Sequence, residues 1–143
     1  MTVYLLDINV LIALTDSQHV HAEAAHRWFA SREGREWATC PITENGFVRI
    51  ISHESYPNST GSVLAAIEVL RELTAGRGHV FWHDDVSIGD VVSPDTVMGS
   101  AAVTDAYLIG LAARHGGKLA TFDRRVSALR VPGGSDAFEV ITP

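Results

Sequence analysis

The chain lacks several features that assign proteins to particular classes. It contains a single cysteine, Cys40, so an internal disulfide bond is excluded. No apolar run approaches the roughly 20 residues that a membrane-spanning helix needs. The first residues also lack the basic segment and the cleavage site of a signal peptide. We therefore expect a soluble cytoplasmic protein that does not contact a membrane.

Basic residues are also scarce. The 11 Lys and Arg residues stand against 17 Asp and Glu, and the net charge of −6 argues against a protein that coats nucleic acid by bulk electrostatics. The balance reverses between residues 106 and 135, where Asp123 is the only acid. The basic residues of that segment are Arg114, Lys118, Arg124, Arg125 and Arg130. A basic rim beside an acidic site would suit a phosphodiester substrate, but scattered surface arginines explain the pattern equally well.

The 143 residues are enough for one domain, and a chain of this size buries roughly 70% of its unfolded surface. Short apolar runs typical of strands alternate with helical patterns. We expect strands at 3–6, 36–40, 80–82, 119–122 and 138–142, and helices at 10–14, 20–31, 41–51, 62–74 and 104–115. In the helix at 62–74, Val63 and Leu70 are expected in the core. The alternation predicts an α/β fold, a three-layer sandwich around a mostly parallel sheet, in a single domain over 1–143.

The segment 103–123 carries two acids in one helix–strand unit. The helix has a face that is apolar except at its first position, with i, i+3, i+4, i+7 spacing. That face consists of Asp105, Leu108, Ile109 and Ala112. Thr104 is predicted to cap this helix, and two glycines end it. A short buried strand follows, and Asp123 comes at its carboxyl end.

Two further acids occupy corresponding places. Glu44 is in line with Phe47 and Ile51 near the start of a helix, and a charge on a core-facing stripe is unusual unless it is paired or binds a metal. Asp7 directly follows the first strand, and ligands of open α/β sheets bind outside the carboxyl ends of strands. Asn9 is predicted to cap the next helix. Asp7 is also compatible with a simple turn.

Together these positions predict that Asp7, Glu44, Asp105 and Asp123 converge at one edge of the sheet. Like charges about 4 Å apart repel by about 4 kcal/mol at an effective dielectric constant of 20, so a proton or a cation must relieve them. Hard oxygen ligands without Cys or His select Mg²⁺ or Mn²⁺, which accept phosphate oxygens. The hydroxyls of Thr104 and Thr121 could orient water or phosphate there, or could simply belong to a cap and a strand.

Other polar groups favour structural interpretations. Three histidines, His19, His21 and His26, suggest zinc, but His21 and His26 do not share a helix face, and no second cluster completes a ligand set. We therefore expect exposed histidines. Asp84 and Asp85 could be additional metal ligands, although a solvated turn explains them better.

Four segments in this order, LLDINVLIAL, ITENGFVRI, VTDAYLIGLA and LATFD, resemble the PIN domain, and specifically the VapC toxins of bacterial toxin–antitoxin pairs. The resemblance covers nearly the whole chain. It implies a PIN-like sandwich and a Mg²⁺- or Mn²⁺-dependent endoribonuclease that cleaves RNA with a metal-activated water, is inhibited by a VapB antitoxin and is usually dimeric. The family's metal-binding acids map to the four acids above, with Asn9, Thr104 and Thr121 as polar supports. Val126 departs from the family, which often has an aromatic residue after its last acid.

Arg124 and Arg125 directly follow Asp123, so we expect them, together with Lys118, to contact RNA phosphates. Two alternatives remain. A phosphatase of the haloacid dehalogenase type also places an Asp after its first strand, but it requires a second Asp where this chain has Asn9. A PIN-like module that only binds a partner would have no reason to keep acids on core-facing stripes.

Overall fold

The computed structural model describes residues 2–32 and 34–143. Its centre is a five-stranded sheet in the order β3-β2-β1-β4-β5, and every strand pair is parallel. The strands are β1 (Tyr4–Leu6), β2 (Trp37–Thr39), β3 (His79–Phe81), β4 (Lys118–Thr121) and β5 (Phe138–Val140). All five expected strands are present. β1, β2 and β5 are shorter than expected by one or two residues, and β3 and β4 begin and end one residue earlier.

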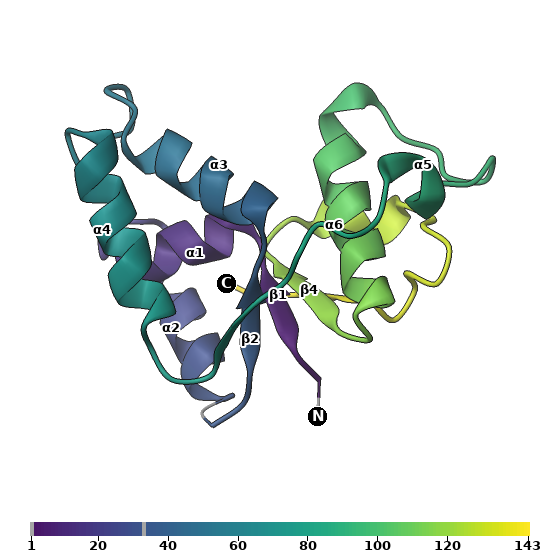
Figure 1. Ribbon diagram of the computed structural model, residues 1–143, viewed down its shortest axis with the longest axis horizontal. Helices are drawn as coiled ribbons and strands as arrows, with labels where there is room; N and C mark the ends of the chain where they lie inside the picture. Colours follow the sequence, from purple (N-terminus) through teal and green to yellow (C-terminus); the bar gives the residue numbers. More distant parts are fainter. Residues whose placement is uncertain (1, 33) are drawn as a thin grey trace.

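Helices cover both faces of the sheet (Figure 1). One layer contains α1 (Ile8–Thr15), α2 (Ala22–Ala30), α3 (Pro41–Ile51) and α4 (Val63–Thr74). The other contains α5 (Ile88–Val91), α6 (Val103–Arg114) and the 3₁₀ turns η1 (Ser100–Ala102) and η2 (Arg124–Ala128). The predicted three-layer α/β/α sandwich is therefore confirmed. Among the residues described, no helix is both long and apolar enough to cross a membrane.

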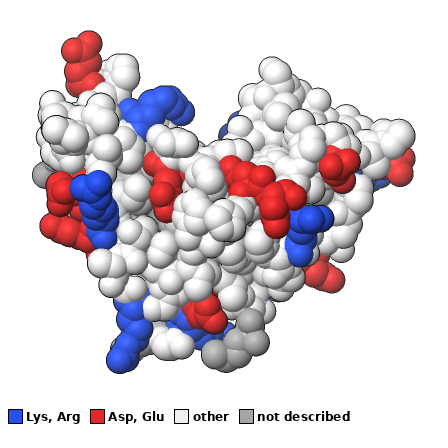
Figure 2. Space-filling view, viewed as in Figure 1, with Lys and Arg blue, Asp and Glu red and all other residues white. Residues whose placement is uncertain are grey.

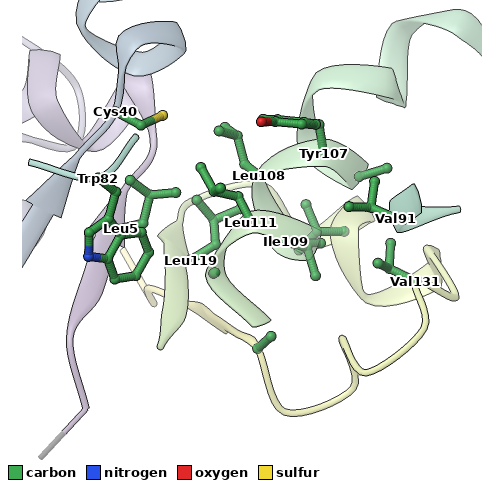
Figure 3. Close-up of a cluster of buried hydrophobic side chains, with 14 of the residues drawn as sticks. Leu5, Cys40, Trp82, Val91, Tyr107, Leu108, Ile109, Leu111, Leu119 and Val131 are labelled. Carbon is green, nitrogen blue, oxygen red and sulfur yellow. The ribbon is translucent and has the colours of Figure 1, made fainter. Parts of the chain in front are cut away.

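Alternating side chains of β1 divide the core into two parts. Leu5 packs with Leu119 and the buried face of α6, whereas Leu6 packs with the layer of α1 and α3. Figure 3 shows Leu5 and Leu119 facing Leu108 and Leu111 of α6. Burying one such leucine contributes about 1.5–3 kcal/mol. Because β1 is covered on both sides, its sequence is a continuous apolar run.

Two helix starts differ from prediction. Asp7, not Asn9, caps α1: its extended backbone lets Oδ1 accept a hydrogen bond from the Ile8 N–H at 2.8 Å, which leaves Asn9 exposed in the first turn. Thr104 does not cap α6, because η1 runs directly into Val103 and Ala102 takes the cap position. Both predicted caps were wrong for the same reason, because α1 and α6 each begin earlier than their apolar patterns indicate.

The strand order places a switch point between β1 and β4. The chain proceeds outward from β1 through β2 to β3, then returns to add β4 and β5 on the other side of β1. In open parallel sheets, ligands bind outside the carboxyl ends of the strands at such a point. Asp7 follows β1 and Asp123 follows β4 by one intervening residue, so both lie at this position.

A glycine allows α3 to cross close to α1 beside this edge. A Cβ on Gly46 of α3 would lie 2.3 Å from Cδ1 of Ile8, the residue after Asp7. Gly46 also lies within the same turn of α3 as Glu44. The close crossing therefore brings the start of α3 next to the start of α1.

Candidate active site

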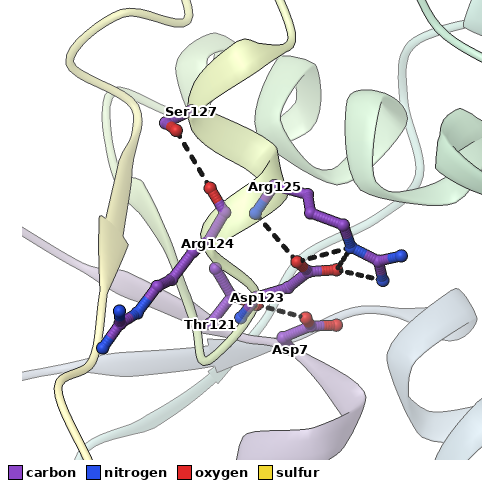
Figure 4. Close-up of polar contacts among 6 residues, drawn as sticks. All are labelled: Asp7, Thr121, Asp123, Arg124, Arg125 and Ser127. Atoms are coloured by element: carbon purple, nitrogen blue, oxygen red, sulfur yellow. Dashed lines mark hydrogen bonds and ion pairs between the residues drawn. The ribbon is translucent and has the colours of Figure 1, made fainter.

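Asp7 is a buried carboxylate held by two hydrogen bonds. Its Oδ1 accepts from the Ile8 N–H, and its Oδ2 accepts from the Thr121 hydroxyl at 2.7 Å. The same Thr121 oxygen accepts the Asp123 N–H at 3.1 Å, and Thr121 is fully buried. One threonine side chain therefore connects the two acids that follow β1 and β4 (Figure 4).

Asp105 enters the same region from the first turn of α6. Burial raises its pKa to about 6, and the charges of Asp7 and Asp123 add to the effect. Burial also raises the pKa of Asp7, with the charge of Asp123 contributing and the bonds from Thr121 and Ile8 opposing. These three aspartates therefore repel one another, and the protein itself leaves part of their negative charge uncompensated.

Arg125 neutralises the third aspartate. Its Nε lies 3.0 Å from Asp123 Oδ1 and its Nη2 2.8 Å from Oδ2, so the guanidinium binds both carboxylate oxygens (Figure 4). The side-chain hydrogen bond from Arg125 is the main reason that the pKa of Asp123 is lowered. The Arg125 guanidinium thus places a positive charge beside Asp105 and Asp123.

A cavity of about 160 Å³ opens between α6 and η2. Its polar wall is formed by Asp105, Asp123 and Arg125, and Met98 and Leu129 contribute to its apolar wall. Figure 2 shows acidic side chains gathered in the middle of this face, beneath the notch between the two helical layers. Asp105 and Asp123 are therefore accessible to a ligand from solvent, whereas Asp7 is buried behind them.

Glu44 differs from the three aspartates. Its Oε2 accepts a hydrogen bond from the Thr39 hydroxyl at 2.6 Å, at the carboxyl end of β2. The charges that raise the pKa values of Asp7 and Asp105 do not include Glu44. The structure thus groups Asp7, Asp105 and Asp123, with Glu44 one strand away on the β2 side. In the described part of the chain, no set of three or more His, Cys, Asp or Glu side chains is close enough to hold a metal ion.

A family model described as the PIN domain matches residues 4–132. The chain belongs to the PIN-domain family. Its relatives include Ribonuclease VapC44 of Mycobacterium tuberculosis, 45% identical over 133 residues, which cover 92% of this chain and 93% of the relative. Ribonuclease VapC39 of the same organism is 49% identical over 121 residues, covering 83% of this chain and 87% of the relative. The resemblance to VapC proteins is therefore confirmed.

Solved structures share the fold of this PIN domain. VapBC2 from Rickettsia felis, bound to a DNA fragment from its promoter, superposes with a TM-score of 0.68 at 11% identity, over 99% of this chain and 100% of that chain. VapC20 of Mycobacterium tuberculosis, a toxin that cleaves the sarcin–ricin loop, gives a TM-score of 0.62 at 13% identity, over 87% and 93%. At these identities the likeness concerns the fold.

The predicted supporting residues of the PIN domain have different positions. Asn9 and Thr104 are exposed, whereas the only hydroxyl proton of Thr121 is donated to Asp7. Lys118 is the first residue of β4 and pairs with Tyr4, so it lies at the opposite end of that strand from Asp123. The Arg124 side chain points away from Asp123 (Figure 4). Of the basic residues predicted to bind RNA, only Arg125 contacts an acid of the site.

Among the remaining histidines and acids, His21 and Asp85 have local partners, whereas Asp84 Oδ1 is buried without a hydrogen-bond partner among the described residues. His26 is exposed as expected, but His19 and His21 are partly buried, and His21 stacks on Phe122 with ring centroids 4.5 Å apart. Asp85 contacts Arg114 at 3.5 Å and His115 at 3.3 Å, as a surface ion-pair residue would. Sequence reasoning missed Thr39, because its contact with Glu44 depends on how the chain turns at Cys40 from β2 into α3.

Proposed function

We propose that this PIN domain is a single-domain, Mg²⁺- or Mn²⁺-dependent endoribonuclease that acts as the toxin of a VapB–VapC-type pair in the cytoplasm. The observation that carries the proposal is the group of three mutually repelling aspartates beside the β1/β4 switch point. The identity to VapC ribonucleases, over most of both chains, supports the reaction class. It also argues against the phosphatase alternative.

The donor set suits a hard divalent cation. Asp7, Asp105 and Asp123 offer only carboxylate oxygens, which are the ligands that such a cation prefers. The positive charge of Arg125 at Asp123 supports the expectation that this group attracts a cation. We propose that a cation would draw these three carboxylates together and displace Arg125 from Asp123, so that the three aspartates would hold it and Glu44 would support it from the β2 side. When bound, such a cation would polarise the scissile phosphate and lower the pKa of water.

The residues of the chain would perform the remaining tasks. The two hydrogen bonds on Asp7 fix its carboxylate, which is the preorganisation that a catalytic site requires. Arg125 is exposed and would exchange Asp123 for an RNA phosphate. Arg124, on the neighbouring surface, would contact a flanking phosphate. Lys118 would at most contact RNA far from the acids.

The proposed partners follow from the relatives. The Rickettsia felis neighbour is a VapBC complex, and we propose that a VapB-type antitoxin inhibits this chain and that the chain forms a homodimer. Expressing the chain alone should slow bacterial growth, and its cognate antitoxin should restore growth. Normal growth, with soluble full-length protein confirmed by blotting, would contradict the toxin role.

A cleavage assay tests the reaction directly. Purified protein should cut pooled RNA in the presence of Mg²⁺ or Mn²⁺, and cleavage should stop when EDTA is added. The Asp7→Asn variant should be inactive, while its circular dichroism spectrum should match that of the parent. Cleavage that persists in EDTA would contradict metal dependence. Absence of cleavage together with antitoxin binding would favour the module that only binds a partner.

A further inference from the structure

Thr39, the last residue of β2, connects two side chains distant in sequence. Its hydroxyl oxygen lies 2.6 Å from Glu44 Oε2 on α3 and 2.7 Å from His79 Nε2 at the start of β3. Thr39 is fully buried, so water does not compete for these contacts. Glu44 and His79 are both partly buried. The three residues form a chain that runs from His79, the register partner of Trp37, to Thr39 and Glu44 at the carboxyl end of β2.

The number of protons available fixes the direction of both hydrogen bonds. A threonine hydroxyl has one proton, and an ionised carboxylate only accepts. Thr39 must therefore donate to Glu44, which leaves its oxygen as the acceptor for His79. The His79 ring must in turn carry a proton on Nε2. This chain of donors leads from His79 through Thr39 to Glu44.

The surroundings of His79 favour this arrangement. The ring packs against Trp37 with centroids 4.8 Å apart and planes inclined by 60°, which fixes its orientation on the sheet. Burial lowers the pKa of His79, opposed by the charge of Glu44, so the ring is neutral near neutral pH and has a single N–H. Glu44 is the facing carboxylate, and Thr39 is the group that lies between them.

We propose that Thr39 and His79 are positioning residues that hold the Glu44 carboxylate in one orientation at the carboxyl end of β2. This inference rests on the proposed function, because it concerns the acid that supports the cation from that side. Glu44 projects from a helix with several rotatable bonds, and without these partners its carboxylate would sample other rotamers. Within the described residues, Oε1 of Glu44 has no hydrogen-bond partner and remains available.

The first test requires neither metal nor RNA. Nitrogen-15 NMR of the metal-free protein reports which ring nitrogen of His79 carries the proton. We expect the Nε2–H tautomer, and a changed Nε2 resonance in Thr39→Val, which keeps the shape and removes the hydroxyl. The Nδ1–H tautomer would overturn the inference, since Thr39 would then donate to His79 and not to Glu44.

The second test separates positioning from stability. Removing a group that orients a metal ligand typically reduces metal affinity or activity by about 10–100-fold. We expect Thr39→Val and His79→Leu to weaken Mn²⁺ binding in that range, measured by electron paramagnetic resonance. Thr39→Ser keeps the hydroxyl and should retain affinity near that of the parent. Equal losses in Thr39→Ser and Thr39→Val, at equal melting temperatures, would contradict a role for the hydroxyl.

Comparing Mn²⁺ binding with and without Thr39→Val in a Glu44→Gln background tests whether Thr39 acts through Glu44. If Thr39 acts through Glu44, Thr39→Val should add little to the loss that Glu44→Gln already causes. Additive losses in the double variant would overturn the inference. If the parent binds Mn²⁺ but does not cleave RNA, the proposed function fails, whereas the NMR and Mn²⁺ measurements still decide the role of Thr39 and His79. If Thr39→Val does not fold, Mn²⁺ binding by His79→Leu and Thr39→Ser tests the inference in its place.

Discussion

The Thr121 hydroxyl is shared between Asp7 and the backbone of Asp123: Oγ1 donates to Asp7 Oδ2 at 2.7 Å and accepts the Asp123 N–H at 3.1 Å. Thr121→Val keeps the shape but leaves Asp7 buried with one partner fewer. Losing a hydrogen bond to a charged group destabilises a protein by about 1.5–3 kcal/mol. We expect a loss of this size in urea unfolding, together with reduced RNA cleavage, and Thr121→Ser should recover most of both. A fully active and stable Thr121→Val would show that Asp7 is positioned without the hydroxyl.

Asp105→Asn removes a charge that the metal-free protein accommodates poorly. The pKa of Asp105 is raised from 3.8 to about 6 by burial and by Asp7 and Asp123. The folded state therefore binds more protons than the unfolded state between these values, and stability falls as the pH rises through that window. In EDTA, the variant should melt above the parent, by a margin that grows from acidic to neutral pH. A margin independent of pH would contradict the raised pKa.

The same variant should lose the effect of metal. A ligand that binds only the folded state stabilises it by mass action. Mg²⁺ or Mn²⁺ should therefore raise the melting temperature of the parent more than that of Asp105→Asn, and the variant should not cleave RNA. Antitoxin binding should largely survive. Equal metal-induced shifts with retained cleavage would remove Asp105 from the site.

Arg125 should compete with the cation for Asp123, because its guanidinium occupies both carboxylate oxygens. In Arg125→Ala, Mn²⁺ should raise the melting temperature at lower concentration than in the parent. Cleavage should require more RNA and depend less on salt, since one phosphate contact is lost. Arg124→Ala is the matched control: it should change the RNA requirement and leave the Mn²⁺ requirement as it is. An unchanged Mn²⁺ requirement in Arg125→Ala would contradict competition.

Tyr56 anchors the loop after α3 to the end of α1. Its hydroxyl donates to Asp16, and this bond is the largest cause of the lowered pKa of Asp16. A lowered carboxyl pKa stabilises the fold above the ordinary value and ceases to do so as the pH falls through the folded value. Tyr56→Phe should therefore destabilise the protein by about 1 kcal/mol at neutral pH and by less in acid.

Tyr107→Phe provides the comparison, because that hydroxyl donates to the neutral carbonyl of Val86 at 2.9 Å. Its effect on the urea midpoint should be the same at neutral and acidic pH. If both variants respond to pH alike, the Asp16 interpretation is wrong.

Local patterns were sufficient to predict the order of helices and strands and the buried faces of α3 and α6. The 3.6-residue period places Asp105 in line with Leu108, and both belong to the same helix face in the structure. Val63 was expected in the core but is 55% exposed, because α4 is an outer helix that contacts chiefly α3. Periodicity identifies the apolar face of a helix, but it does not indicate how much of that face the neighbouring elements cover.

The polar contacts of the site were less predictable. Thr39 and His79 are separated by 40 positions, and no spacing rule connects them. Asp7 as a helix cap and Arg125 as the partner of Asp123 depend on where a helix begins and how a turn folds. The sequence predicts that Asp7, Asp105 and Asp123 lie near one another, but it does not predict that Glu44 lies apart on the β2 side. The orientation of each carboxylate is set by tertiary neighbours.

The central position of β1 affects how the protein is made. Asp7 is synthesised well before its partner Thr121, which lies 114 positions later on a strand that must insert beside β1. A growing chain on the ribosome therefore has an incomplete acid group until Thr121 and Asp123 have been translated. Any product that ends before Thr121 lacks both that hydroxyl and Asp123. Premature stop codons anywhere before Thr121 should therefore yield inert protein, whatever the RNA target.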